Sequence, residues 1–464
     1  MINIINTPPK LSEISSKKLQ LLDEQSFACL RKNIKKRNKK RFNTQTTKKI
    51  DRKLILKKYP NKKSEHINIE KSQIYTLYRE CKPSEILDFF NPNRGKNWKK
   101  GKQRKKVHEK TIEIKNFSFI DFPNETLELF YRLASYEPYI QKASADFADS
   151  KVCDIAPYLL WGIVKKEMYP YIKGGKIQNR ISNVIKGLDL DRFMSMSLSY
   201  ADDRNIIALP PIWKPRRPLI ADQQITTLDI SATRLVNKIN EWLVNLEPPM
   251  QLSEEGCVNV TTFAIEILEN AQRHSVKDEE GNWYMTAFME YRDNQYFCSL
   301  SFINTGIPIY ESILSTSNPI VAKELHDYIA HHSNIDKAIL STVYALQDGS
   351  TRQNYKGSRG GIGMLRMVKF INEIGYTELV NEKPVIAIIS GNVYIKFSDQ
   401  YGNAVKKEDN RHYQWFNPSQ DRSEKPDHNH AFLLKRTFPG TIITTRFMLD
   451  AESLSKKVKK NDNN

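Results

Sequence analysis

The chain has 464 residues, with 72 Lys/Arg against 53 Asp/Glu and a formal net charge of +19, a length sufficient for two or three domains. Five scattered cysteines without a C-x-x-C pair argue for reduced thiols and against a zinc module. Because the sequence has neither a long apolar run nor a leader pattern at its N-terminus, we expect a cytoplasmic protein that does not span a membrane.

Residues 1–110 form the most basic region of the sequence. Within it, residues 31–63 contain 16 Lys/Arg against one acid and residues 94–110 contain nine against one, so the rest of the chain is slightly acidic. Like-charged blocks of this kind are typical of partly disordered arms that bind polyanions, and an apolar spacing over 72–90 predicts a short helical pair between them. Both stretches are candidates for binding nucleic acid, and a solubilising tail or a contact with an acidic protein are the alternatives. Three aromatic residues within them have rings that can stack on bases: Phe42, Tyr59 and Trp98.

Residues 111–208 change to alternating strand-like and helix-like segments. Alternating or apolar patterns predict strands at 111–114 and 143–147 and helices at 124–135 and 156–164. This alternation predicts a small α/β domain.

The middle region resembles a STAS domain, the fold of anti-anti-sigma factors, in the order of its segments. In the signalling members of that family, a serine that follows an aspartate at the start of a helix is phosphorylated. Here Asp154 is followed by Ile155 and Ala156, so the resemblance implies a scaffold or dimerisation role without a phosphoacceptor. The Pro-rich residues 209–224 that follow are predicted to be a linker.

An amphipathic segment from Thr262 to His274 contains the first candidate site residues, Glu266 and Asn270. Four residues correspond to about one helical turn, so the two side chains share a helix face. A carboxylate can orient or deprotonate a water molecule, and a neighbouring carboxamide oxygen can hold a Mg²⁺ ion that carries phosphates. An exposed polar stripe is the alternative interpretation.

A predicted hairpin follows this helix. Its strands cover 283–291 and 296–303, and Asn304-Thr305-Gly306 forms a polar turn at the end of the second strand.

A glycine cluster at 357–363 precedes a helix predicted over 364–374. Glycines in this position let backbone N–H groups approach an anion, and the helix dipole adds to the attraction. Paired strands are predicted at 385–390 and 393–397, and a last strand is predicted over 439–449.

The order of these segments over 228–449 resembles the ATP-binding domain of the GHKL superfamily, which DNA gyrase, Hsp90, histidine kinases and MutL share. The Glu266 and Asn270 pair resembles its N box, residues 304–306 resemble its first glycine box, and residues 361–364 resemble its second.

The resemblance implies an α+β chain whose nucleotide domain is a Bergerat-type two-layer α/β sandwich, with a mixed sheet and helices on one face. Five regions are expected: a basic, partly disordered N-terminal region (1–110), a STAS-like domain (111–208), a linker (209–224), the GHKL domain (225–450) and a disordered tail (451–464).

The resemblance also implies roles for individual residues. Glu266 corresponds to the general base for ATP hydrolysis, and Asn270 corresponds to the Mg²⁺ ligand. Residues 310–356 correspond to the lid over the triphosphate. The remaining positions expected to contact the nucleotide are Asn304, Gly306, Lys356, Gly361, Gly363 and Thr441.

One position departs from the family pattern. The first glycine box normally begins with an aspartate that accepts a hydrogen bond from the adenine amino group, whereas this chain has Asn304, and Ile307-Pro308 replace the second glycine. An amide oxygen still accepts that bond, but with less charge assistance. We therefore expect reduced affinity or an altered base choice, and a degenerate fold that binds no nucleotide is the alternative.

Two function classes are compatible with these features. The first is an ATPase switch in which lid closure changes how the protein engages an effector protein or nucleic acid, in a bacterial regulatory or anti-phage system. The second is a protein kinase or phosphotransfer regulator related to anti-sigma factor kinases. Glu266 and the basic stretches favour the switch, and the missing acceptor serine disfavours the kinase. An ATP-dependent homodimer, common in the superfamily, is a further candidate state.

Overall fold

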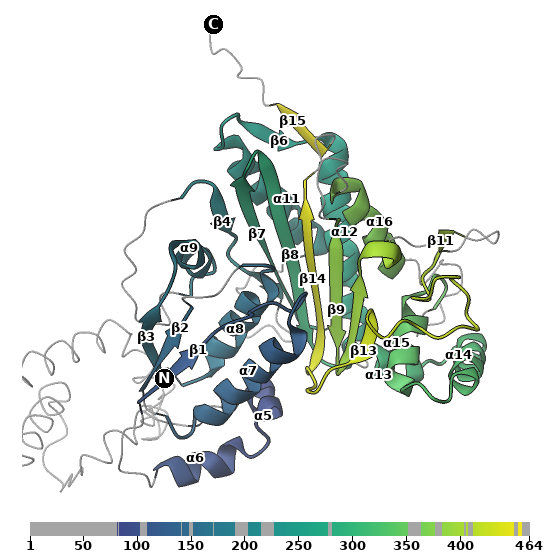
Figure 1. The fold of residues 1–464 in the computed structure, drawn as a ribbon, viewed down its shortest axis with the longest axis horizontal. Coiled ribbons are helices and arrows are strands. Elements are labelled where there is room, and N and C mark those ends of the chain that lie inside the picture. The colour runs from purple at the N-terminus through teal and green to yellow at the C-terminus, as the bar shows by residue number, and fades with distance from the viewer. Residues whose placement is uncertain are drawn as a thin grey trace, which may run out of the picture. The chain divides into compact units, whose positions relative to one another are not determined.

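The computed structural model describes residues of the unit that begins at Cys81 (Figure 1). Basic residues 31–63 lie outside the described part of the chain. Within that part, none of the helices combines the length and apolarity that crossing a bilayer requires. The described residues are 81, 83–102, 109–140, 142–147, 152–169, 171–190, 203–214, 227–276, 281–350, 363–375, 383–402, 405–406, 412–449 and 453–456.

Two short helices open the unit. The helix α5 (Glu85–Phe90) begins after Ser84, whose hydroxyl accepts a hydrogen bond from the Leu87 N–H at 3.1 Å and so satisfies a free donor of the first turn. The helix α6 (Arg94–Lys102) follows. The described residues of the predicted pair over 72–90 therefore contain α5, while α6 lies in the second basic stretch.

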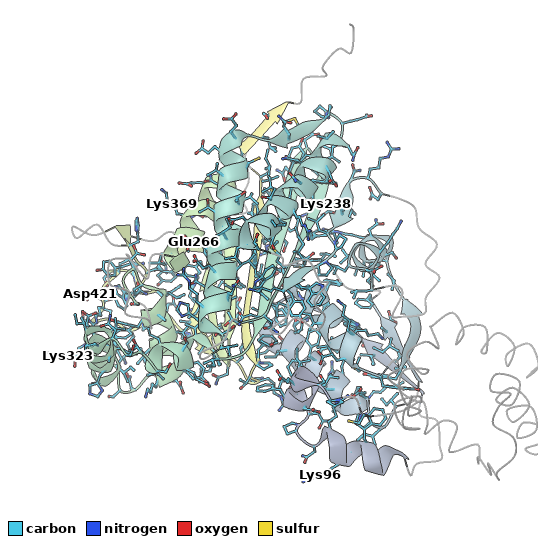
Figure 2. The ribbon with its side chains drawn as sticks, turned by 180° about the vertical axis from the view of Figure 1, so that it is seen from behind. Lys96, Lys238, Glu266, Lys323, Lys369 and Asp421 are labelled. Atoms are coloured by element: carbon cyan, nitrogen blue, oxygen red, sulfur yellow. The ribbon has the colours of Figure 1, made fainter. Side chains whose placement is uncertain are left out.

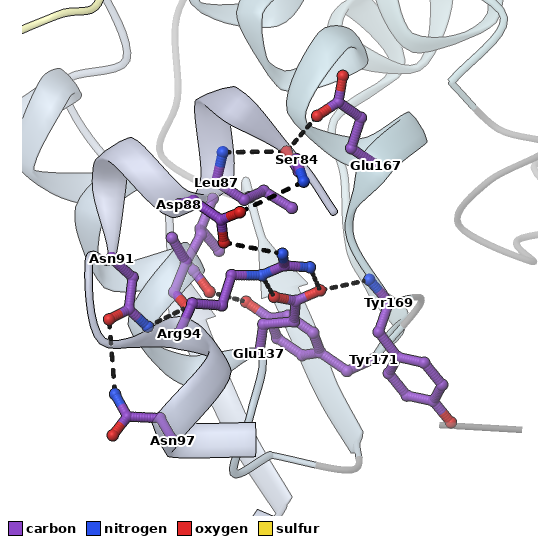
Figure 3. Close-up of polar contacts among 12 residues, drawn as sticks. Ser84, Leu87, Asp88, Asn91, Arg94, Asn97, Glu137, Glu167, Tyr169 and Tyr171 are labelled. Atoms are coloured by element: carbon purple, nitrogen blue, oxygen red, sulfur yellow. Dashed lines mark hydrogen bonds and ion pairs between the residues drawn. The ribbon is translucent and has the colours of Figure 1, made fainter. Parts of the chain in front are cut away.

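Arg94, at the start of α6, is buried against the carboxylate of Glu137. Its Nε lies 2.6 Å and its Nη2 3.2 Å from the two carboxylate oxygens, and the Tyr169 N–H also donates to Glu137, at 2.7 Å (Figure 3). Trp98 is 1% exposed and packs edge-on against the Tyr169 ring. Trp98 therefore cannot stack on bases in this fold, which corrects that part of the sequence prediction.

A small α/β layer follows, in which three parallel strands alternate with three helices. The strands pair in the order β1 (Glu109–Glu113), β2 (Lys142–Asp146) and β3 (Ile172–Lys176). The helices are α7 (Pro123–Tyr136), α8 (Ala156–Glu167) and α9 (Asn179–Gly187). The strands and helices that the sequence predicts in this region are present, with small shifts at their ends.

The second sheet has eight strands in the order β13, β10, β9, β14, β8, β7 and β4, with β5 also paired to β7. Every pairing described in it is antiparallel, which corrects the predicted mixed sheet. Short turns join β7 to β8 and β9 to β10, and such turns impose antiparallel neighbours. The strands are β4 (Ile206–Ala208), β5 (Ile212–Lys214), β7 (Trp283–Arg292), β8 (Gln295–Thr305), β9 (Val385–Ser390), β10 (Val393–Phe397), β13 (Ala431–Leu433) and β14 (Gly440–Met448).

The strand β5 lies within the range predicted to be a linker. Trp213 pairs with Tyr284 of β7, and the two rings stack with their centroids 6.2 Å apart. Residues 209–214 are therefore part of the sheet edge, where aromatic cross-strand pairs are favourable.

A two-stranded sheet involves residues of the predicted tail. The strand β15 (Leu454–Lys456) pairs with β6 (Met250–Leu252). The range 451–464 thus includes paired backbone and is not disordered throughout.

Alternating side chains of the large sheet enter two separate cores. From β8, Leu300 and Phe302 pack on one side and Ile303 packs on the other. On the second side α8 contacts β7, β8 and β14, so the sheet carries helices on both faces and not on one face as predicted (Figure 1). Three helices cover the first side: α11 (Leu228–Val244), α12 (Glu254–His274) and α16 (Gly363–Gly375).

Three helices lie between β8 and α16, and all of their residues except Ile309 fall within the predicted lid (310–356): α13 (Ile309–Leu314), α14 (Pro319–His331) and α15 (Lys337–Leu346). A segment between β10 and β13 packs on them. The Trp415 ring lies 5.1 Å from the Tyr328 ring, the Arg422 guanidinium lies 5.7 Å from that ring, and the His332 Nε2 lies 2.9 Å from the Arg422 carbonyl oxygen. These contacts hold α14 against that segment, while α15 contacts β10 and β13.

Candidate functional site

The helix α12 carries Glu266 and Asn270 and has a well-defined start. The Ser253 hydroxyl accepts a hydrogen bond from the Gly256 N–H at 3.1 Å, and two glutamates occupy the first turn, where the helix dipole favours negative charge. The helix starts eight residues before the predicted Thr262 because these capping residues precede the amphipathic run. Glu266 and Asn270 are both partly exposed and lie along one edge of the buried stripe of the helix.

The two site residues of α12 project toward α16. On the opposite side, the Cys257 sulfur lies 3.8 Å from the Asn240 amide of α11. Glu266 is nine residues further along, or about two and a half turns, and therefore points the other way. Figure 2 shows α12 between α16, which carries the labelled Lys369, and α11, which carries Lys238. Glu266 and Asn270 are thus on the same side as α16, whose first residue is Gly363.

A row of polar side chains crosses three neighbouring strands of the sheet. Thr441 of β14 is paired with Asn304 of β8 on one side and with Ser390 of β9 on the other. Directly paired residues project from the same sheet face. That face is the one covered by α12 and α16, because Phe302, two residues before Asn304, belongs to their core.

Hydrogen bonds connect two members of this row. The Ile309 N–H donates to the Ser390 hydroxyl at 2.7 Å, and the Ser390 and Thr441 hydroxyl oxygens lie 2.8 Å apart. All three side chains of the row are buried, with Ser390 at 0%, Thr441 at 7% and Asn304 at 8% exposure. The sequence prediction named Asn304 and Thr441 but missed Ser390, which ends an apolar strand on the same face as Ile388.

Hydrogen bonds join the residues that follow α12 to the end of β8. The Ile307 N–H donates to the Ser275 carbonyl at 2.7 Å, and Asn282 bonds the backbone and side chain of Thr305. Gly306 has φ +146°, and a Cβ added there would lie 2.0 Å from the Ser275 carbonyl oxygen. Only glycine allows this close approach. The junction fixes the helix that carries Glu266 and Asn270 relative to the strand that carries Asn304.

The glycine-rich segment is described only at its end. Gly363 begins α16, while Lys356 and Gly361 lie outside the described residues. On one side of the sheet the structure therefore places α12 with Glu266 and Asn270, the start of α16 at Gly363, and the Asn304–Thr441 row, with Gly306 at the junction of α12 and β8.

A second polar cluster lies on the opposite face of the same strands. Asp154, at the start of α8, is fully buried and accepts hydrogen bonds from the Ser118 hydroxyl at 2.6 Å and the Phe119 N–H at 2.9 Å. The Thr444 hydroxyl of β14 lies 3.4 Å from its other oxygen and 2.7 Å from the Ser301 hydroxyl. Loss of hydration in this buried position raises the pKa of Asp154 to about 6, although the hydrogen bonds it accepts oppose the rise.

The oxygen donors in this region suit a Mg²⁺ ion that is held mainly by waters and by the phosphate oxygens of a bound molecule. Mg²⁺ in phosphate-binding sites keeps several waters and takes one or two protein oxygens plus phosphate oxygens. Asn270 would supply one such carboxamide oxygen, about one helical turn from Glu266. Among the residues that the structure describes, no group of three or more His, Cys, Asp or Glu side chains forms a metal site.

Comparison of the chain with protein-family models, curated proteins and solved structures gives no match.

Proposed function

We propose that residues 225–450 bind ATP with Mg²⁺ as a GHKL-type domain and hydrolyse it, and that the protein acts as a nucleotide-dependent switch. The observation that carries this proposal is the shared position of the N-box pair and the Asn304–Thr441 row on one sheet face, joined at the Gly306 junction. Separate sequence segments supply these groups, so their convergence supports one ligand site.

Each group has a distinct role in this proposal. Glu266 accepts a proton from the attacking water as a general base, and its partial exposure leaves room for that water. Asn270 contributes its amide oxygen to the Mg²⁺ that carries the phosphates. Asn304 and Thr441 are uncharged, so they suit a nucleobase edge better than a phosphate.

The switch is proposed to work through the strands that carry the site. The strands β8 and β14 present Asn304 and Thr441 on one face and contact Asp154 and α8 through the other. A shift of these strands on nucleotide binding therefore changes contacts on both faces. A change of this kind is a means of passing the nucleotide state to an effector protein or nucleic acid.

Phosphate release from γ-labelled ATP in the presence of Mg²⁺ tests the catalytic part of the proposal. Glu266→Gln should lower the rate about 10²- to 10⁴-fold, because the amide cannot accept the proton from water. Glu269→Gln is the matched control, since Glu269 lies on the same helix and its carboxylate forms an ion pair with Arg273, and it should keep the wild-type rate. Equal rates for wild type and Glu266→Gln would contradict the assigned role.

The same assay distinguishes the kinase alternative. A kinase transfers the labelled phosphoryl group to a protein, whereas an ATPase releases it as free phosphate. Label that appears on a partner protein, and disappears in Glu266→Gln, would favour the phosphotransfer regulator over the switch.

A further inference from the structure

The hydroxyl pair of Ser390 and Thr441 has a restricted arrangement of protons. One acceptor site of the Ser390 oxygen is occupied by the Ile309 N–H at 2.7 Å, and its other close contact is the Thr441 hydroxyl at 2.8 Å. Ser390 is fully buried. Among the described residues, the Thr441 oxygen is the acceptor that the structure offers to the Ser390 proton.

This geometry selects one of two possible directions for the bond. If Thr441 donated to Ser390, the Ser390 proton would remain buried without an acceptor, which is a costly arrangement. If Ser390 donates to Thr441, the proton left over is that of Thr441, the less completely buried side chain of the two at 7% exposure, and the chain of hydrogen bonds runs from the Ile309 N–H through Ser390 to Thr441, with each bond polarising the next. The Thr441 proton then points away from Ser390, so Thr441 can donate a hydrogen bond to a ligand that lies beside it.

We infer that Ser390 sets the base selectivity of the site by fixing Thr441 as a hydrogen-bond donor, so that 6-aminopurine nucleotides are preferred over 6-oxopurine nucleotides. This inference rests on the proposed nucleotide-binding function. Adenine presents an amino donor beside the N1 acceptor, whereas hypoxanthine and guanine present a carbonyl acceptor beside an N1–H donor. A Thr441 hydroxyl that is fixed as a donor can bond to the N1 acceptor of adenine. It faces a second donor, N1–H, in the oxopurines.

Asn304 alone cannot make this choice. Its amide has a donor end and an acceptor end, and a rotation of the side chain exchanges them. Asn304 can therefore accept from the adenine amino group or donate to an oxopurine carbonyl. The fixed hydroxyl of Thr441 discriminates where the amide does not, and Ser390 acts as a positioning residue through Thr441.

Equilibrium binding of ATP and of ITP, each with Mg²⁺, tests this role on the full chain. ITP differs from ATP only at the 6-position and N1, so the ratio of the two dissociation constants isolates the base edge. Wild type should prefer ATP. Ser390→Ala should reduce that preference about tenfold, because the freed Thr441 hydroxyl can rotate to accept from N1–H.

Ser301→Ala provides a matched control. Ser301 is also a buried serine, bonded at 2.7 Å to a threonine of β14, but this pair lies on the opposite face of the sheet. Its substitution removes an equivalent hydroxyl pair and should leave the ATP to ITP ratio at the wild-type value. Thr441→Val should remove the same part of the preference as Ser390→Ala, and the double variant should show no further loss.

The outcomes separate this inference from the proposed function. Failure of the wild type to bind either nucleotide overturns both. Binding of ATP by Ser390→Ala with an unchanged ATP to ITP ratio overturns the inference alone. If Ser390→Ala does not fold, the wild type is titrated with the ATP analogue in which N1 is replaced by C–H. An affinity about tenfold below that for ATP supports the Thr441 donor, and an equal affinity overturns it.

Discussion

Arg94 is almost completely buried although it lies in a stretch of sequence dominated by basic residues. Its guanidinium makes a two-point contact with Glu137, which is itself fully buried. Removal of one partner leaves an uncompensated charge in the interior. Arg94→Ala should therefore lower the free energy of unfolding by about 3–5 kcal/mol in denaturant titrations.

Arg132→Ala is the control for this prediction, because Arg132 lies on the exposed side of α7 and should change stability by less than about 0.5 kcal/mol. Equal stabilities of the two variants would show that the Arg94 contact contributes little.

Asp154 makes stability depend on pH. Its folded-state pKa of about 6 lies above its ordinary value of 3.8, mainly because burial disfavours the carboxylate. The contribution of a group with a raised pKa is fully present below pH 4 and is lost as the pH rises through 6. By linkage this loss amounts to about 3 kcal/mol.

Comparison of wild type with Asp154→Asn isolates that contribution. The asparagine does not ionise, so the wild type should lose stability relative to the variant between pH 4 and pH 7. A difference in unfolding free energy that stays constant over this range would contradict the raised pKa.

At the scale of elements, the junction between α12 and β8 is the most constrained connection of the site. Gly306→Ala should lower the unfolding free energy by about 2–4 kcal/mol, because a Cβ at φ +146° would meet the Ser275 carbonyl. It should also weaken ATP binding, since it displaces Asn304 relative to α12.

Gly95→Ala is the control for Gly306→Ala, because it tests whether an added methyl group lowers the free energy of unfolding at any glycine. Gly95 lies in α6, and a Cβ there would have no neighbour within 4 Å, so the change should stabilise the protein by up to about 1 kcal/mol. Thermal melts of both variants check the prediction, and a Gly306→Ala protein as stable as wild type would argue against a tight junction.

Elements defined by local patterns are the ones that the sequence predicts. The β7–β8 hairpin follows from alternating residues around the Asp293-Asn294 turn, where both residues adopt positive φ. The register that places Ser390 beside Thr441 depends on pairing between segments 51 residues apart, which periodicity does not reveal. The strand β9 (Val385–Ser390) is an almost continuous apolar run in the sequence and is buried throughout in the structure. This run was the sequence signal that both faces of the sheet are covered.

At the scale of the whole molecule, the α/β layer and the large sheet share one hydrophobic core. Side chains of α8 pack with apolar residues from the second face of the sheet, among them Phe288, Phe297, Ile303, Ile389 and Ile442. The expected separation into a 111–208 domain and a 225–450 domain, joined by a linker over 209–224, therefore does not describe this shared packing. The sequence could not show this, because the contacts join segments far apart along the chain.

Truncation tests this shared core. A fragment of residues 81–456 should unfold in one cooperative transition, whereas a fragment of residues 227–456 should lack a sharp transition, because it exposes the second face of the sheet. Calorimetric melts of both fragments provide the measurement. A cooperative transition at the same temperature in the shorter fragment would mean that the α/β layer is dispensable for folding.

The most direct test of the proposed ATP site is a calorimetric titration of Glu266→Gln with ATP, because this variant should retain the nucleotide without consuming it. We expect saturable binding of one ATP per chain that depends on Mg²⁺ and is weakened at least about tenfold by adding Asn270→Ala. Absence of binding in Glu266→Gln and in the wild type, or binding that is unaffected by Asn270→Ala, would contradict the assignment of this sheet face as an ATP site.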